Sequence, residues 1–275
     1  MELNTLIERP LALPSLPRAV ALLMSELGQP EPNLRRLNQF FGLDPVLAAR
    51  LLELANSPPF RLTRRISGVP EALALLGTAP LKSLVSTATL GGSSRSVPGV
   101  NMQQFWRYSL NTAKLARSLA VLVRRNQIAA YSAGLLHALG ELAMHLGDPE
   151  HALAVDTLVA PLDLRRAKVE QRLLGYCYVD VSAGLARRWQ LPEIVVDALQ
   201  HQNAPFENNA YEPLGGVVHL AAWRARALEA EMDNRELTVS FPDKVGLALG
   251  LDIDMVLQQD PIDWTVRADS DDYLV

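Results

Sequence analysis

The stretch DPVLAARLLELANS, residues 44–57, decides the fold of this chain. Asp44 and Pro45 form a helix start signal, because an aspartate side chain caps free backbone N–H groups and proline fits the first helical turn. Apolar residues then recur at helical spacing through Ala55. The segment from Asn56 to Phe60 ends the helix, because a proline disfavours the helical conformation of the residue before it. The stretch therefore predicts a short amphipathic helix followed by a sharp connector.

Helical patterns continue on both sides of this stretch, and no segment shows sustained strand alternation. Asn33 is the expected N-cap of a helix that ends near Gly42, and Ser67 and Thr78 are the expected caps of two later helices, the second ending near Leu90. The glycine- and serine-rich segment 91–99 predicts a linker. Further helices are expected over 16–27, 102–125, 131–146, 150–159, 162–174, 177–189, 192–202, 213–232, 243–249 and 252–258, with a short extended segment over 238–241.

The composition is typical of a globular helical protein. Hydrophobic residues make up 49% of the 275 residues and charged residues 20%, which suits a large packed core. A single cysteine, Cys177, excludes an internal disulfide and a cysteine-rich metal site, and fits a reducing compartment. The first ten residues lack the apolar core of a signal peptide, and no apolar run is long enough for a membrane span. We therefore expect a cytoplasmic protein without a membrane partner.

The net charge of −4 is unevenly distributed. Residues 229–275 hold twelve acidic and three basic side chains, whereas the rest of the chain is slightly basic. A nucleic-acid binder needs a concentrated basic face to neutralise phosphates. The best basic cluster is Arg61, Arg64 and Arg65, which a solvated loop explains as well, so a nucleic-acid partner is not expected.

The familiar catalytic motifs, including phosphate-binding glycine loops, the nucleophile elbow and the HExxH zinc motif, are absent. His137, Glu141 and His145 are spaced by four, so on one helix adjacent members could share a metal ion. Zinc would need further ligands from elsewhere, and the small residues between them suit close packing, so buried, hydrogen-bonded histidines are the more ordinary interpretation. Cys177 has no base tied to it in the sequence, so it is expected to be inert packing.

Three ordered segments resemble the HDOD family. They are LPSLP at 13–17, the DP-start helix ending in LANS at 44–57, and ISGVPEALALLG at 66–77. The likeness continues through FWR at 105–107, AGLLH at 133–137 and WQLP at 189–192. The resemblance therefore covers residues 10–230.

This resemblance implies an all-α, multi-helical, two-lobed bundle of the HDOD and HD-domain type. The implied divisions are a five-helix N-terminal lobe over 10–92, an HD-like helical lobe over 100–232, and an acidic C-terminal extension over 233–275.

HDOD domains resemble the HD phosphohydrolases in their second half, and HD enzymes hold metal ions with histidines and aspartates from several helices. Transferred onto this sequence, those ligand positions fall at Tyr108, His137, Ala138, Tyr178, His201 and Ala222. Tyrosine is a poor ligand at neutral pH, because its phenol has a reference pKa near ~10 and stays protonated, and alanine cannot coordinate at all. With two imidazoles left, the resemblance implies a vestigial pocket without catalytic residues, metal or cofactor. A retained nucleotide-binding pocket and residual metal-dependent hydrolysis are the alternatives.

The function that the resemblance implies is a non-catalytic regulatory or output domain in bacterial signal transduction, acting through a protein partner. The alternatives are a metal-dependent phosphohydrolase of nucleotides or cyclic dinucleotides, and a nucleotide sensor that uses the vestigial pocket. The expected contact surface is the loop that contains Asn56, Pro58, Phe60, Arg61, Arg64 and Arg65. A rigid connector packed on the second lobe is the competing interpretation of this loop.

Overall fold

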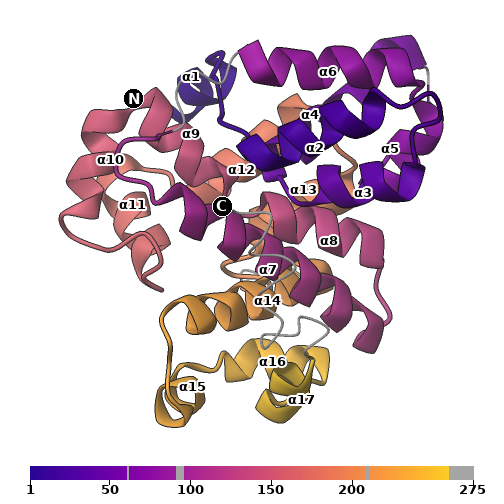
Figure 1. The fold of residues 1–275 in the computed structure, drawn as a ribbon. Coiled ribbons are helices and arrows are strands. Elements are labelled where there is room, and N and C mark those ends of the chain that lie inside the picture. The colour runs from indigo at the N-terminus through magenta and orange to yellow at the C-terminus, as the bar shows by residue number, and fades with distance from the viewer. Residues whose placement is uncertain (61, 91–95, 208–210, 260–275) are drawn as a thin grey trace.

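The structure, a computed structural model, describes residues 1–60, 62–90, 96–207 and 211–259 (Figure 1). Within these ranges the chain is helical and contains no strand, and Val97 and Val100 form an isolated antiparallel bridge. The all-α prediction is thereby confirmed. No helix in these ranges combines the length and the hydropathy that a membrane crossing requires.

The N-terminal lobe follows the predicted helix order. Its elements are α2 (Pro17–Leu27), α3 (Leu34–Gly42), α4 (Pro45–Ala55), the 3-10 turn η1 (Pro58–Phe60), α5 (Val69–Leu75) and α6 (Thr78–Leu90). Asn33 caps α3 as predicted, because its Oδ1 accepts from the first free backbone N–H groups. Asp44 caps α4 through Oδ1, which accepts from Leu47 N at 2.6 Å, while its Oδ2 accepts from Leu16 N just before α2. One buried carboxylate therefore fixes the starts of two helices.

The second lobe is built around a long central helix. Its elements are α7 (Met102–Leu122), α8 (Gln127–Leu136), α9 (Leu139–Gly147), α10 (Pro149–Asp156), α11 (Arg166–Leu174), α12 (Tyr178–Arg188), α13 (Glu193–His201) and α14 (Pro213–Glu229). α7 packs along α8 and α14. Arg107 of α7 donates two hydrogen bonds to the Glu229 carboxylate of α14, at 2.7 and 2.6 Å. This bidentate ion pair fixes the two helices side by side.

Three short helices follow α14 at one end of the molecule (Figure 1). They are α15 (Asn234–Ser240), α16 (Asp243–Leu249) and α17 (Ile253–Gln258), of which α16 and α17 pack on α14. At the other end of the chain α1 (Leu3–Glu8), which was not predicted from the sequence, packs on α9 and α12.

The two lobes share one hydrophobic core. α4 packs on α5 and α6 within its own lobe and on α7 and α8 across the boundary. Leu47 and Leu51 are completely buried, and they belong to the same buried cluster as Leu115 and Leu119 of α7. The stretch that decided the fold therefore forms the joint between the lobes. The boundaries predicted at 92, 100 and 232 stay a prediction.

The helix predicted over 131–146 is wrong, because two helices meet there. α8 ends at Leu136 and α9 begins at Leu139. The His137 carbonyl at the break accepts from the Ser182 hydroxyl at 3.0 Å and from the Gln202 amide at 3.1 Å. Side chains from α12 and from the residue that follows α13 thus satisfy a carbonyl that a continuous helix would have paired internally.

Smaller differences have local causes. Ser67 is not a cap, because its N–H and hydroxyl both bond to the Glu71 carboxylate and the helix begins at Val69. The extended segment predicted over 238–241 is wrong, because a capping box formed by Asp233 and Glu236 starts α15 through Ser240. The linker predicted at 91–99 lies mostly outside the described residues.

Candidate functional site

Tyr108 and His137 form a buried polar cluster in the second lobe, at the position of the predicted pocket, and this cluster is called the Tyr108 pocket below. Their rings meet edge to face, with centroids 4.7 Å apart, and both side chains are buried. His137 Nδ1 lies 2.7 Å from the Gly134 carbonyl oxygen, to which it donates, so Nε2 carries the lone pair of a neutral ring. Burial, together with the nearby charge of Arg226, lowers the pKa of His137 to about 3. Its Nε2 atom is buried and has no hydrogen-bond partner among the described residues.

Arg226 supplies a cation to this pocket, and sequence reasoning missed it. Its Nη2 donates to the Tyr108 hydroxyl at 3.2 Å, and its guanidinium carbon lies 5.9 Å from the Tyr108 ring centroid. Burial alone would lower the pKa of Arg226, but Tyr108, Tyr178 and Glu141 raise it above its ordinary value. Arg226 lies one turn after Ala222 on α14. Residues four apart on a helix share a face, so the sequence could have indicated that Arg226 faces the same site as the expected aspartate position at Ala222.

Tyr178 completes the pocket from the start of α12. Its hydroxyl lies 3.4 Å from Asn203 Oδ1, and its backbone N–H donates to Glu170 at 2.8 Å. Burial raises the pKa of Tyr178 further above its ordinary value, and the Tyr108 phenol adds to the shift. Burial likewise raises the pKa of Tyr108. Both phenols therefore stay protonated and neutral at physiological pH.

The remaining predicted pocket residues are placed differently. Ala138 is fully buried at the break between α8 and α9, and Ala222 is buried on α14. His201 is the last residue of α13 and is partly exposed. The next residue, Gln202, is buried and donates to the His137 carbonyl. The structure thus brings Gln202, rather than His201, against His137.

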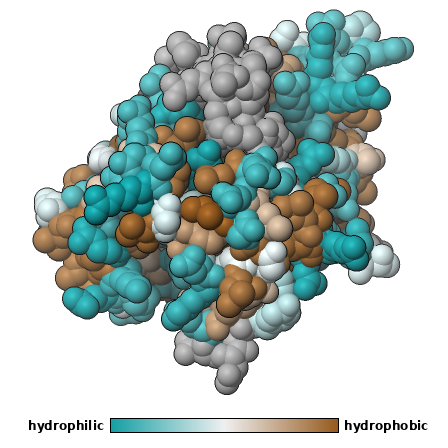
Figure 2. Space-filling view, turned by 90° about the horizontal axis from the view of Figure 1, so that it is seen from below, coloured by the Kyte–Doolittle hydropathy of each residue, from teal (hydrophilic) through white to brown (hydrophobic). Residues whose placement is uncertain are grey.

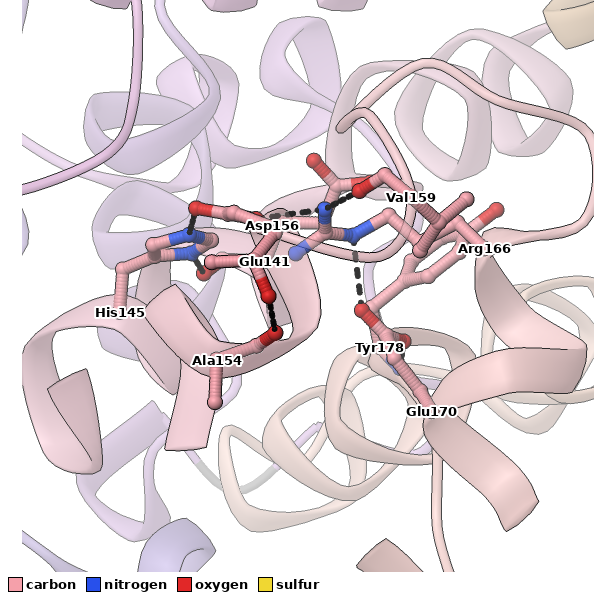
Figure 3. Close-up of polar contacts among 9 residues, drawn as sticks. Glu141, His145, Ala154, Asp156, Val159, Arg166, Glu170 and Tyr178 are labelled. Atoms are coloured by element: carbon pink, nitrogen blue, oxygen red, sulfur yellow. Dashed lines mark hydrogen bonds and ion pairs between the residues drawn. The ribbon is translucent and has the colours of Figure 1, made fainter. Parts of the chain in front are cut away.

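A second buried cluster surrounds Arg166 on α11 (Figure 3). Arg166 donates to Asp156 at 2.7 Å and to Glu170 at 2.8 Å, and His145 Nε2 lies 3.0 Å from the other oxygen of Asp156. Glu170 is the residue that also accepts from the Tyr178 backbone. The polar contacts therefore form a continuous chain from Asp156, at the end of α10, to Tyr178, the first residue of α12 and a member of the Tyr108 pocket.

Glu141 lies between the two clusters. Burial raises its pKa to about 8, although Arg166 and Arg226 act to lower it. The helix break separates His137 from Glu141 and His145, so the three do not form one stripe on one helix. In the described part of the chain, no three His, Cys, Asp or Glu side chains are grouped so that they could hold a metal ion. Cys177 is buried, and burial raises the pKa of its thiol to about 12, so it is not a ready nucleophile.

The predicted contact loop is tied to the rest of the protein at several points. Asn56 exchanges hydrogen bonds with the backbone of Ile66 at 3.0 and 2.7 Å. Arg65 Nη1 crosses to the second lobe and donates to both the backbone and side-chain oxygens of Gln190, at 2.9 and 2.7 Å.

The other loop residues that the structure describes make different kinds of contact. Arg64 pairs with Glu71 at 3.1 Å, Pro58 lies in η1, and Phe60 packs partly on the core. Arg61 lies outside the described residues. Asn56 and Arg65 therefore hold the loop in place, which favours a rigid connector over a contact surface at these two residues.

The order and packing of the helices define an all-α domain with an HDOD and HD-like fold. The sequence model of the HDOD domain matches residues 13–205, and the chain belongs to the HDOD family. An uncharacterized protein of Treponema pallidum (strain Nichols) is 27% identical over 232 residues, which are 83% of this chain and 45% of that protein. This chain spans less than half the length of the curated relatives it matches.

Solved structures share the fold. The MmoQ response regulator from Methylococcus capsulatus str. Bath superposes with a TM-score of 0.72 at 19% identity, covering 90% of this chain and 97% of that one. An HDOD domain protein with unknown function from Geobacter sulfurreducens superposes with a TM-score of 0.54 at 25% identity, covering 95% and 93%. The predicted family and the two-lobed helical architecture are thereby confirmed.

Proposed function

We propose that this protein is a non-catalytic regulatory domain that acts in signal transduction by binding another protein. The observation that supports the non-catalytic part is the Arg226 guanidinium beside Tyr108 and His137. A divalent ion held where the Tyr108 ring lies, 5.9 Å from the guanidinium carbon of Arg226, would be opposed by about 5.5 kcal/mol at an effective dielectric constant of about 20. The two neutral phenols and the alanines at positions 138 and 222 offer no anionic ligand to offset that repulsion.

The signalling part of the proposal rests on the family. MmoQ, which shares the fold, is a response regulator. We propose a comparable output role for this chain, with the signal received elsewhere and passed on through a protein contact.

The contact surface favoured by the structure lies on α15 and α16. Val239 and Leu247 are 80% and 85% exposed, the two highest values among the large hydrophobic residues described. The face seen from below in Figure 2 places hydrophobic side chains among hydrophilic ones, the mixture typical of transient interfaces. Leu158, 64% exposed on the segment after α10, provides a matched control site.

The first experiment tests for catalysis. The purified protein is analysed for iron, manganese and zinc and assayed against mononucleotides and cyclic dinucleotides with each metal added. We expect no stoichiometric metal and no turnover. Metal at one equivalent together with turnover lost in His137→Ala would overturn the non-catalytic proposal.

The second experiment tests for the partner. Tagged protein is cross-linked in cells, and the captured proteins are compared between the wild type, Leu247→Glu and Leu158→Glu. We expect one partner that is retained by Leu158→Glu and lost with Leu247→Glu. Equal capture by all three proteins would remove α16 from the interface.

The second candidate function is a metal-dependent nucleotide phosphohydrolase. It is favoured by one observation, the buried His137 Nε2 lone pair without a partner among the described residues. If this candidate holds, Arg226→Met should raise metal affinity, because the competing cation is removed. No metal binding by Arg226→Met would eliminate it.

A further inference from the structure

A cleft of about 180 Å³ lies between the lobes, away from the Tyr108 pocket. Its walls come from α4 of the first lobe, from α12 of the second, and from the segment Arg9–Leu13 that follows α1. The apolar floor is formed by Leu13, Val46 and Ala49. A ligand in this cleft would contact both lobes at once.

Three arginines line the cleft, and backbone carbonyls hold each of them. Arg50 donates to the Leu13 carbonyl at 3.4 Å, Arg188 to the Arg9 carbonyl at 3.2 Å, and Arg9 to the Gly147 carbonyl at 2.6 Å. No ion pair within 4.0 Å joins them to an acidic side chain of the described residues. Carbonyl contacts orient a guanidinium without neutralising it, so each keeps its charge and further N–H donors for a ligand.

Glu53 and Trp189 add two further kinds of contact to the same cleft. The Glu53 carboxylate faces Arg50 and Arg188 without a hydrogen bond to them, and burial raises its pKa against their opposing effect. Trp189 is partly buried, and its indole ring offers a flat apolar surface. The cleft therefore combines three cations, one hydrogen-bond acceptor and one stacking surface.

We propose that this cleft binds a nucleoside monophosphate. With three arginines and one carboxylate, the cleft carries a net charge of +2, which complements a phosphate monoester of roughly −1.5 to −2 at neutral pH. The guanidinium groups of Arg50 and Arg188 hold the phosphate, the base stacks on Trp189, and Glu53 accepts from an N–H of the base. Because the ligand bridges α4 and α12, its binding stabilises one arrangement of the lobes. This inference is independent of the proposed protein-binding function.

Binding is tested by calorimetry on the full chain at low salt with AMP and GMP as probes. Three partial ligands serve for comparison. Adenosine lacks the phosphate, ribose 5-phosphate lacks the base, and inorganic phosphate lacks the whole nucleoside. We expect one mononucleotide per chain, with each partial ligand at least about tenfold weaker. Inorganic phosphate that binds as tightly as AMP, or no heat with either mononucleotide at millimolar concentration, would overturn the proposal.

Three variants assign the contacts. Arg50→Gln and Arg188→Gln should each weaken AMP binding about tenfold, since each removes a charge-assisted contact. Arg172→Gln, an exposed arginine on α11, is the matched control and should bind as the wild type does. Wild-type affinity in both cleft variants would refute the site, and the circular dichroism melting curve of each variant identifies any loss of binding that comes from unfolding.

A further variant tests the acceptor. Glu53→Ala should strengthen ribose 5-phosphate binding, because a negative charge is removed, while AMP loses part of its advantage over ribose 5-phosphate. An unchanged ratio of the two affinities would remove Glu53 from the proposed contact.

Discussion

Replacing Asp44 by alanine tests the argument that one buried carboxylate starts two helices. The carboxylate is completely buried and accepts from Leu16 N and Leu47 N. Loss of the cap on α4 costs about 1 kcal/mol, and leaving the Leu16 N–H buried and unpaired costs about 1–3 kcal/mol more. We therefore expect Asp44→Ala to lower the free energy of unfolding by about 2–4 kcal/mol.

The assay is urea denaturation at pH 7.5, followed by circular dichroism. Burial raises the pKa of Asp44 to about 6, so at this pH the carboxylate is ionised and both oxygens accept. Asn33→Ala is the matched control, because Asn33 also accepts from two backbone N–H groups but on the exposed start of α3. It should cost about 1 kcal/mol.

The comparison between the two variants decides the outcome. The loss in the free energy of unfolding with Asp44→Asn should fall between the losses with Asp44→Ala and Asn33→Ala. The reason is that an amide keeps one acceptor oxygen and turns a donor toward the second N–H group. If Asp44→Ala costs no more than Asn33→Ala, the bond to the start of α2 contributes nothing and the argument fails.

The remaining predictions concern the interior of the second lobe and are measured by the same denaturation assay. Burial holds the pKa of Glu141 near 8, above its ordinary 4.5, so the folded protein keeps a proton that the unfolded chain releases. This carboxyl should lower stability by about 1 kcal/mol from pH 6.5 to 7.5, whereas His137, held neutral in the fold, acts in the opposite direction, so the contribution of Glu141 is measured as the difference in slope between the wild type and Glu141→Gln. Arg166→Met leaves the carboxylate of Glu170 buried without its cation and should cost about 3–5 kcal/mol, with partial recovery when Glu170→Gln is added. Gly140→Ala should cost about 3 kcal/mol or more, because the new Cβ would meet a backbone oxygen of α12 at 2.0 Å; Gly77→Ala, with nothing within 4 Å, should stay within about 0.5 kcal/mol. Equal pH slopes in the wild type and Glu141→Gln, no recovery in the double variant, or equal effects at the two glycines would contradict the respective argument.

The parts of the fold that could be predicted from the sequence are those whose causes are local. The capping bonds of Asn33 and of Asp44 Oδ1 reach backbone groups two or three residues away, so these caps could be predicted from neighbouring residues, whereas the bond from Leu16 N to Asp44 Oδ2 could not. The break after α8 could not be predicted in this way. It depends on Ser182 of α12 and on Gln202 just after α13, which are distant in sequence and meet His137 only after folding.

The candidate site shows the same division. Tyr108 and His137 were predicted, since the family pattern marks their positions, and the structure brings them together. Arg226 was missed, because no motif contains it and an arginine on a helix is usually a solvated charge. Gln202 was missed because the family pattern places the ligand at His201, one residue earlier, and one step along a helix turns a side chain by about 100°.

The guanidinium at the centre of the pocket has a consequence for how the domain depends on its surroundings. A metal ion is acquired from the medium, exchanges with it, and is lost to chelators or during metal starvation. Arg226 is synthesised with the chain, is present once per molecule, and keeps its charge at every physiological pH. If the proposed non-catalytic role holds, the contact between Arg226 of α14 and Tyr108 of α7 would be independent of the supply of iron or manganese, because this cation is covalently attached.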